Sequence, residues 1–279
     1  TAATKENLDN LEEKANNQIS TFALLKNNLK SFKDIVLDIQ SQQEYGFTGN
    51  TSDATVATLT ASGSKAGSTI DSSIVVNTLA SSHTLTGPSY ASTTATVGAR
   101  NLQISFGTWS ADPTAGGGQS FTANSLSTIS VSTSSSSTLT DLRDAINNAV
   151  TDSDNDGNKD VLASIIYDGS NYMLMLKSQS GASNEMKITD SNGSPTYAYN
   201  ATDGAQLTQR VPGVNAAFTV DGISMTRTTN EIDDLFDGFT LDLKKTSGSA
   251  VRISSEVDLV GVKTLMDNYV VTYNEVMKN

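Results

Sequence analysis

Residues 8–39 of the chain read LDNLEEKANNQISTFALLKNNLKSFKDIVLDI, and their apolar residues recur at alternating steps of three and four. The positions of this repeat are Leu8, Leu11, Ala15, Gln18, Phe22, Leu25, Leu29, Phe32, Val36 and Ile39, of which only Gln18 is polar. Such an alternation is a 3.5-residue repeat, which keeps one face of a helix against a partner helix along its length. The repeat therefore predicts one long helix over residues 5–43.

The same spacing returns at the other end of the chain, in Leu259, Val262, Met266, Tyr269, Tyr273 and Val276. It predicts a final helix that begins near Glu256. Because a long helix depends on tertiary packing for its stability, we expect the two helices to pair as an antiparallel, coiled-coil-like stalk. Gln18 on the predicted seam is then either a tolerated polar defect or a residue that fixes the register, in which case Gln18→Leu would raise thermal stability but loosen the pairing.

Composition narrows the possible partners. The chain of 279 residues carries a formal net charge of −12 and has no cysteine. An acidic surface repels phosphate backbones and anionic lipids, so we expect neither nucleic acid nor a membrane as a partner. Without cysteine there are no disulfides and no thiolate ligands or nucleophiles. No secretory signal is visible, and both ends of the chain lie within the helical repeat, so we expect a fragment of a longer protein.

Between the two predicted helices the period changes. Ser and Thr dominate residues 51–140, and short alternating apolar runs such as Ile74 and Val76, or Leu102, Ile104 and Phe106, predict strands. Disorder is the alternative for so polar a stretch, but the alternation persists and charge is sparse. A further strand is predicted over Leu126 to Val131.

Two local signals interrupt the strands. Thr138 is placed to cap a short helix with Asp141 in its first turn, and the apolar face of that helix would comprise Leu139, Leu142, Ala145, Ile146 and Ala149. Asn230 similarly predicts a capped helical turn that carries Ile232, Leu235 and Phe236. The pairs Asp168-Gly169 and Asp221-Gly222 lie between alternating runs and predict two β-hairpins.

One segment has the composition of a cation site. Residues 152–160, here called the acidic loop, follow a D-x-D-x-D-G pattern and offer the candidate calcium ligands Asp152, Asp154, Asp156, Asn158 and Asp160. The twelfth position of such a loop is Ala163, which has no carboxylate, and the flanking helices of an EF-hand are missing. A solvated acidic turn is the alternative.

No set of residues predicts catalysis or a cofactor. His83 is the only histidine and is expected on the surface, so neither a zinc site nor a Ser-His-Asp relay follows. Asp233 and Asp234 are better explained by the end of a helix than as a glycosidase pair. Trp109 is expected either in a core or in contact with sugars or a neighbouring subunit. Gly116–Gly118 lacks the lysine of a phosphate-binding loop.

Four stretches together resemble the bacterial flagellar filament cap protein, the hook-associated protein 2 family. Residues 76–80 (VNTLA) resemble a V-x-x-L-A strand end, and residues 138–147 (TLTDLRDAIN) resemble the "IN" motif. Residues 217–243 match the C-terminal signature of the family, and residues 269–274 (YVVTYN) its V-x-x-Y-N helix. The positions that carry these motifs are Leu79, Ala80, Leu142, Ile146, Asn147, Gly222, Asn230, Gly238, Tyr273 and Asn274.

The resemblance implies an α+β chain with three parts. We expect a helical stalk from residues 1–50 and 245–279, a discontinuous β-rich head domain from 51–110 and 206–244, and an inserted α+β domain over 111–205. The family forms a ring-shaped homo-oligomer at the filament tip outside the cell, where it promotes folding and insertion of exported flagellin. Its members are structural proteins rather than enzymes.

Two other interpretations stay open at this point. Flagellin or a hook–filament junction protein also has helical ends and a β middle, although the signature over residues 217–243 argues against it. A secreted adhesin or glycan-binding module, with host glycans or mucin as its partner, would also fit the Ser/Thr-rich head and Trp109.

Overall fold

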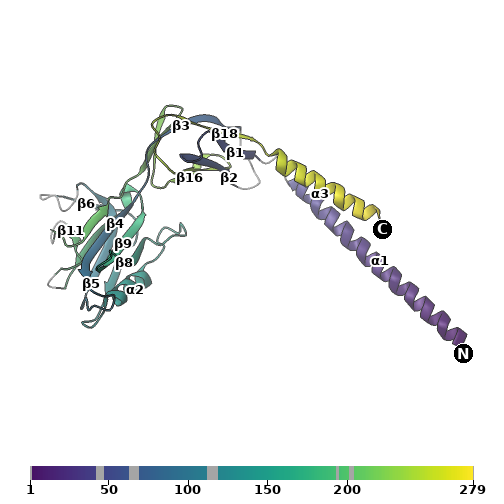
Figure 1. Ribbon diagram of the computed structural model, residues 1–279, viewed down its shortest axis with the longest axis horizontal. Coiled ribbons are helices and arrows are strands. Elements are labelled where there is room, and N and C mark those ends of the chain that lie inside the picture. Colours follow the sequence, from purple (N-terminus) through teal and green to yellow (C-terminus); the bar gives the residue numbers. More distant parts are fainter. Residues whose placement is uncertain are drawn as a thin grey trace.

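The computed structural model describes residues 2–41, 47–62, 69–111, 119–192, 195–200 and 204–278. Figure 1 shows an elongated molecule with two helices at one end and two sheet-rich units in succession at the other. The helices are α1 (Ala2–Ser41) and α3 (Leu259–Met277), which come from opposite ends of the chain and lie side by side. The α+β class and the predicted stalk are therefore confirmed. None of the described helices has the length and apolar character that crossing a bilayer requires.

The described contact between the two helices involves the C-terminal half of α1. On α1 the half-buried side chains are Leu25, Asn28, Phe32 and Ile35, and on α3 they are Leu265, Tyr269 and Val276, with Thr272 buried. The ring of Phe32 lies 5.4 Å from that of Tyr269 and 6.1 Å from that of Tyr273, measured between centroids. The side chains of residues 4–24, Gln18 among them, are all exposed, because α1 extends well beyond the end of α3.

The unit next to the helices, here called the proximal unit, is built from the first three and the last five strands. Its strands are β1 (Phe47–Thr51), β2 (Ala57–Ala61), β3 (Asp71–Thr78), β14 (Ala216–Val220), β15 (Ile223–Arg227), β16 (Glu231–Phe236), β17 (Phe239–Leu243) and β18 (Val251–Val257). They form a five-stranded sheet in the order β1-β18-β3-β14-β15 and a three-stranded sheet in the order β16-β17-β2. Alternating residues from both sheets, such as Ile74, Phe218 and Leu241, make one core.

The unit farthest from the helices, here called the distal unit, contains the strands in between and the short helix α2 (Leu139–Ala149). Its strands are β4 (Ser82–Tyr90), β5 (Asn101–Trp109), β6 (Phe121–Ala123), β7 (Ile129–Ser132), β8 (Val161–Tyr167), β9 (Tyr172–Ser180), β10 (Glu185–Asp190), β11 (Tyr199–Asn200), β12 (Gly204–Ala205) and β13 (Thr208–Val211). One sheet has the order β12-β11-β10-β5-β6, with β7 also paired to β5, and the other has the order β13-β4-β9-β8.

Helix α2 closes the distal core as its sequence predicts. Thr138 accepts a hydrogen bond from the backbone N–H of Asp141 at 3.2 Å, and the Asp141 carboxylate accepts one from the Thr138 N–H at 2.8 Å. This capping box fixes the first turn, and Leu139, Leu142 and Ile146 are then buried. The two predicted hairpins are also confirmed, as β8–β9 and β14–β15.

Two predicted elements are wrong. Residues 231–236 form strand β16, which pairs with β17 across an irregular register, rather than a capped helical turn. A local cap signal at Asn230 is overridden because Ile232 packs in the proximal core and the side chain of Asn230 binds a distant strand end. The final helix begins at Leu259 rather than near Glu256, since β18 continues to Val257 and Asp258 caps the helix through the Gly261 N–H at 2.9 Å.

The two cores also bear on the division into domains. One core contains Leu85, Leu102 and Phe106 together with the side chains of α2, whereas the other ends at Ala80 and resumes at Ala216. The expected boundaries assign residues 82–110 to the proximal side. We propose instead that the inserted domain begins near Ser82 and ends near Pro212.

Candidate functional site

The chain crosses between the proximal and distal units twice, and the two crossings are hydrogen-bonded to each other. The backbone N–H of Ser81 donates to the carbonyl of Val214 at 3.0 Å, and the Val214 N–H donates back at 3.2 Å. The Ser81 hydroxyl also donates to the carbonyl of Pro212 at 2.7 Å. These bonds hold the outgoing and returning segments as a short two-stranded connection.

An asparagine side chain fixes the proximal end of this connection. The Asn230 Oδ1 accepts from the backbone N–H of Ala80 at 2.7 Å, and its Nδ2 donates to the Ala80 carbonyl at 3.0 Å. An amide side chain can make this pair of bonds because it carries a donor and an acceptor side by side. The arrangement, here called an asparagine clamp, joins two motif positions that are 150 residues apart in the sequence.

The distal unit contains a second asparagine clamp of the same kind. From α2, the Asn147 Nδ2 donates to the carbonyl of Ala163 at 2.8 Å, and the Ala163 N–H donates to the Asn147 Oδ1 at 2.9 Å. Ala163 lies on β8, which is the last strand of its sheet. The clamp therefore satisfies backbone groups on a sheet edge that has no further strand beside it in the described chain.

The remaining motif positions lie in the two cores, at turns or on the helix pair. Leu142, Ile146 and Ala80 are buried and Leu79 is half-buried. Gly222 and Gly238 have φ angles of +84° and +78°, a region that favours glycine. Tyr273 flanks Phe32 on the helix pair, and the Asn274 carbonyl accepts from the Lys278 N–H. Any role in assembly stays a prediction for all ten positions.

His83 and Trp109 are both buried, and only His83 was expected on the surface. His83 is fully buried on β4, where its Nδ1 accepts from the Met186 N–H at 2.8 Å, so its placement on the surface is wrong. Trp109 is buried and donates through Nε1 to the Met186 carbonyl at 3.1 Å, which leaves it in the core rather than open to sugars. For His83, the alternation with Leu85 along β4 was the available signal.

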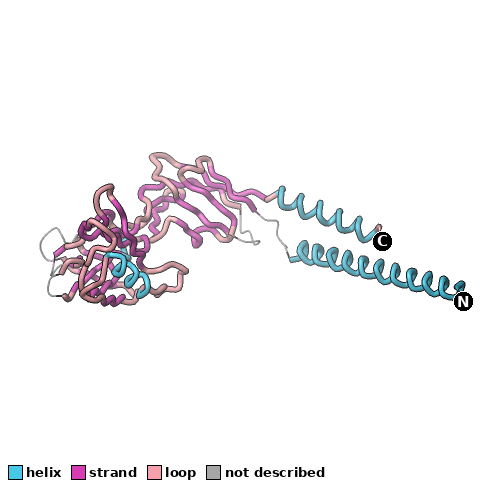
Figure 2. The backbone as a smooth tube through the Cα atoms, turned by 60° about the horizontal axis from the view of Figure 1, so that its bottom comes forward, coloured by secondary structure: helices cyan, strands magenta, loops and turns pink. Residues whose placement is uncertain are grey.

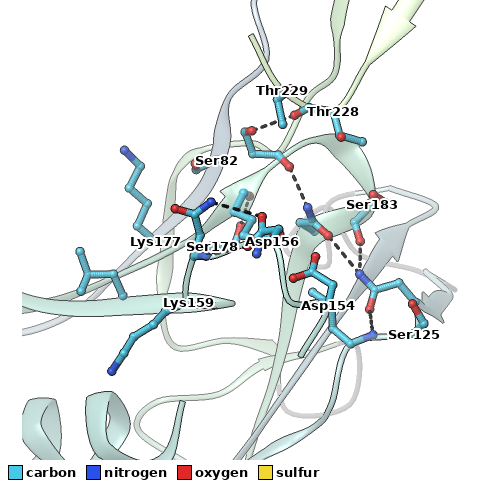
Figure 3. A pocket seen from close by; sticks show the side chains of 17 residues that line it. Ser82, Ser125, Asp154, Asp156, Lys159, Lys177, Ser178, Ser183, Thr228 and Thr229 are labelled. Atoms are coloured by element: carbon cyan, nitrogen blue, oxygen red, sulfur yellow. Dashed lines mark hydrogen bonds between the residues drawn. The ribbon is translucent and has the colours of Figure 1, made fainter. Parts of the chain in front are cut away.

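A polar pocket of about 670 Å³ lies where the two units meet (Figure 3). Asp154, Asp156 and Lys159 from the acidic loop line it, together with Thr228 and Thr229 from the proximal unit. The other lining residues are Ser82, Asn124, Ser125, Leu126, Asn158, Leu162, Lys177, Ser178, Gln179, Ser180, Ser183 and Asn184. Most of the lining residues therefore carry a hydroxyl, amide or carboxylate group.

The acidic loop partly gathers the predicted calcium ligands. Carboxylate oxygens of Asp152, Asp154 and Asp156 lie within 4.8 Å of one another. Asp160, by contrast, is buried and accepts from the Ser153 hydroxyl at 2.5 Å, so it faces the fold. Asp152 also accepts from the backbone N–H groups of residues 156 and 157. Calcium binding stays a prediction, which calorimetric titration of the intact chain would reject if it gave no heat.

The other sites considered from sequence provide no catalytic arrangement among the described residues. The carboxylate of Asp234 is paired with Arg227 at 2.9 Å, and this guanidinium lowers the pKa of Asp234 below its ordinary value. Asp233 lies beside it on strand β16. Gly116–Gly118 lies outside the described residues.

Comparison with known proteins agrees with the motif positions. The family described as "Flagellar hook-associated protein 2 N-terminus" matches residues 1–83, and "Flagellar hook-associated protein 2 C-terminus" matches residues 213–279. Together the two matches span more than half of the chain and cover both helices and the whole proximal unit. The chain belongs to the flagellar hook-associated protein 2 family.

Curated members of the family are similar over part of their length. The B-type flagellar hook-associated protein 2 of Pseudomonas aeruginosa PAO1 is 30% identical over 161 residues, which are 52% of this chain and 33% of that protein. The flagellar hook-associated protein 2 of Salmonella typhimurium LT2 is 31% identical over 135 residues, or 46% of this chain and 28% of that protein. The chain thus spans about a third of the length of these relatives.

Solved structures agree with the fold. The D1-D2-D3 domains of the flagellar cap protein FliD from Escherichia coli align with a TM-score of 0.71 at 22% identity, covering 93% of this chain and 70% of that one. FliD (HAP2) from Pseudomonas aeruginosa PAO1 aligns with a TM-score of 0.55 at 27% identity, covering 80% of this chain and 94% of that one. The first match shows that the fold is shared, and the second shows a similar fold at a higher sequence identity.

Proposed function

We propose that the protein caps the distal end of a bacterial flagellar filament and promotes the insertion and folding of exported flagellin. The observation that carries this proposal is the family match at both ends of the chain. The fold brings these segments together as the helix pair α1 and α3, here called the leg, which is followed by the two sheet-rich units, here called the head. Members of the family are structural proteins, so we expect no enzymatic activity. The location that follows is extracellular, at the filament tip.

The architecture supports a mechanical role. The leg is joined to the proximal unit through β1 and β18, which pair from Phe47 opposite Val257 to Thr51 opposite Ile253. The asparagine clamp at Asn230 and the paired crossings at Ser81 then connect the proximal unit to the distal one. A displacement of the leg can be passed along this series of hydrogen-bonded contacts to the head.

The partners that follow are further copies of the chain, arranged as a ring, and flagellin. An acidic chain with many Ser and Thr residues suits a head that is exposed outside the cell and must stay soluble.

Complementation tests the cap function. The coding sequence that contains this chain is expressed in a motile strain that lacks its own hook-associated protein 2. We expect restored swimming and filaments, whereas an empty vector leaves monomeric flagellin in the medium. The matched variant Asn230→Ala should complement less well at equal expression. Full secretion of unpolymerised flagellin despite stable expression of the unmodified protein would contradict the proposal.

A glycan-binding role is a second candidate, and the pocket of Figure 3 favours it. Hydroxyl and amide groups from both units, with Asp154 and Asp156, match the donors and acceptors of a polyhydroxylated ligand. Trp109 does not take part because it is buried. A glycan array that includes mucin-type glycans tests this role. Binding that survives Asp154→Ala and Asp156→Ala would exclude the pocket.

A further inference from the structure

The distal unit buries the only histidine of the chain, and its ring makes a hydrogen bond that requires a neutral imidazole. His83 is 0% exposed on β4. Its Nδ1 accepts a hydrogen bond from the backbone N–H of Met186 at 2.8 Å. A backbone N–H can only donate, so Nδ1 must present its lone pair and the proton of the neutral ring lies on Nε2. A proton added to Nδ1 would remove the acceptor of this bond.

The Met186 backbone is bonded to side chains on the side that faces away from β5. Farther along β10, the described part of β11 meets that same side where Ile188 pairs with Tyr199. At Met186 the N–H is bonded by His83, and the carbonyl accepts from Nε1 of Trp109 at 3.1 Å. Met186 is also 0% exposed, so a lost bond could not be replaced by bulk water. The ring of His83 therefore joins β4 of one distal sheet to β10 of the other.

Among the described residues, the elements packed against the ring present two titratable groups that face it. Tyr199 on β11 has its ring centroid 5.3 Å from that of His83, and its hydroxyl is hydrogen-bonded to β13. Glu185 lies at the start of β10, and its Oε2 accepts from the backbone N–H of Trp109 at 3.1 Å. The charged residues of the neighbouring strands β9 and β13 are exposed, namely Lys177 and Arg210. Strand β5 and residues 212–215 contain no titratable side chain. Glu185 is therefore the acid whose contribution has to be separated from that of His83.

We propose that the hydrogen bond between Met186 and His83, here called the histidine latch, is acid-sensitive: it joins the two distal sheets while the ring is neutral and opens when the ring is protonated. A charged ring has lost its acceptor and is costly to keep in a site without access to water, so uptake of the proton requires β4 to separate from β10.

The latch lies at the end of the distal unit that adjoins the proximal one. His83 follows the outgoing crossing at Ser81 by two residues. On the returning crossing, a Cβ added at Gly213 would lie 3.6 Å from the Cβ of His83 and 3.0 Å from the Cγ of Glu185. Opening of the latch therefore loosens the distal unit where both crossings enter it.

Linkage gives the direction of the effect. In the unfolded chain the imidazole takes up a proton below about pH 6.5, whereas the latch keeps it neutral in the folded chain. Below this pH the unfolded state binds one proton more than the folded state. The folding equilibrium constant should then fall about tenfold for each further pH unit, and above this pH the latch contributes its full stability. Ordinary carboxylates titrate near pH 4, so the interval from about pH 6.5 to about pH 5 isolates the histidine.

Urea unfolding of the intact chain tests the latch, with the fluorescence of Trp109 as the probe because its indole is bonded to Met186. We expect the midpoint to be constant above about pH 7 and to fall between about pH 6.5 and about pH 5. His83→Gln should remove this fall, since an amide oxygen can accept the same bond but takes up no proton. An equal fall in His83→Gln would overturn the proposal. So would a fall that persists in His83→Gln and disappears in the control Glu185→Gln, because the acid would then be responsible.

Nuclear magnetic resonance tests the same point without a substitution. The chain has one histidine, so its imidazole signal needs no assignment. We expect this signal to stay in its neutral position at about pH 6.5, where an exposed histidine is half protonated, and to change only as the distal unit opens at lower pH. A signal that titrates near pH 6.5 while Trp109 fluorescence shows a folded distal unit would overturn the proposal. The proposal is independent of the cap function.

Discussion

The two asparagine clamps allow a prediction in which one substitution has different effects in the two units. Asn147→Ala removes two hydrogen bonds, each with a net contribution of about 1 kcal/mol. It also leaves the N–H and carbonyl of Ala163, which is 2% exposed, without their partner. Leaving each of these two buried groups unsatisfied costs about 1–3 kcal/mol, and this figure includes the lost hydrogen bond. We expect the distal unit to lose about 2–6 kcal/mol of its free energy of unfolding.

Trp109 provides a local probe of this loss. It is the only tryptophan, and it belongs to the same core as α2 and β8. With a urea dependence of roughly 2 kcal/mol per M, the midpoint of its fluorescence change should fall by about 1–3 M in Asn147→Ala. Asn230→Ala is the matched control in the proximal unit. It should leave the Trp109 midpoint unchanged while hydrogen exchange of Ala80 and its neighbours accelerates.

Two results would refute this reasoning. An unchanged Trp109 midpoint in Asn147→Ala would mean that the clamp contributes nothing to stability. Equal shifts in Asn147→Ala and Asn230→Ala would mean that the proximal and distal units unfold as one cooperative block, contrary to their separate cores.

Three further predictions follow from the helix pair, the α2 capping box and a close backbone approach. Phe32→Ala should cost about 2 kcal/mol and reduce the helical circular dichroism, whereas the exposed Phe22→Ala should not; equal losses would contradict the observed seam. The capping hydrogen bonds from Thr138 lower the pKa of Asp141 below its ordinary value, so this group stabilises the fold above its ordinary pKa and the stabilisation is lost as pH falls through the lowered pKa. Asp141→Asn should therefore show a smaller drop in melting temperature between pH 7 and pH 3, and an equal drop would count against the cap. Gly107→Ala should cost about 2–3 kcal/mol by Trp109 fluorescence, because its Cβ would lie 2.1 Å from a carbonyl oxygen of β6, whereas Gly248→Ala meets nothing within 4 Å and should cost little; similar effects would refute the packing argument.

Signals that act over a few residues were readable from the sequence. The spacing of three and four predicted both terminal helices and their pairing, because a 3.5-residue repeat has meaning only against another helix. The Thr138–Asp141 capping box and the turns at Asp168-Gly169 and Asp221-Gly222 were equally local, and all three are confirmed. The family motifs could also be identified from the sequence, but the contacts that Asn147 and Asn230 make could not.

Contacts between distant residues decided the rest. Asn230 resembles a helix cap within its own segment, yet it clamps Ala80, and the following residues become a strand because β17 pairs with them. His83 is polar, but its strand lies where Met186 supplies a hydrogen bond to its ring. The repeat on α1 likewise predicts an apolar face without saying which part of it α3 covers. Local sequence determined the kinds of elements in this protein, and the tertiary structure decided their partners, because backbone and side-chain hydrogen bonds between segments over a hundred residues apart outweigh weak local preferences.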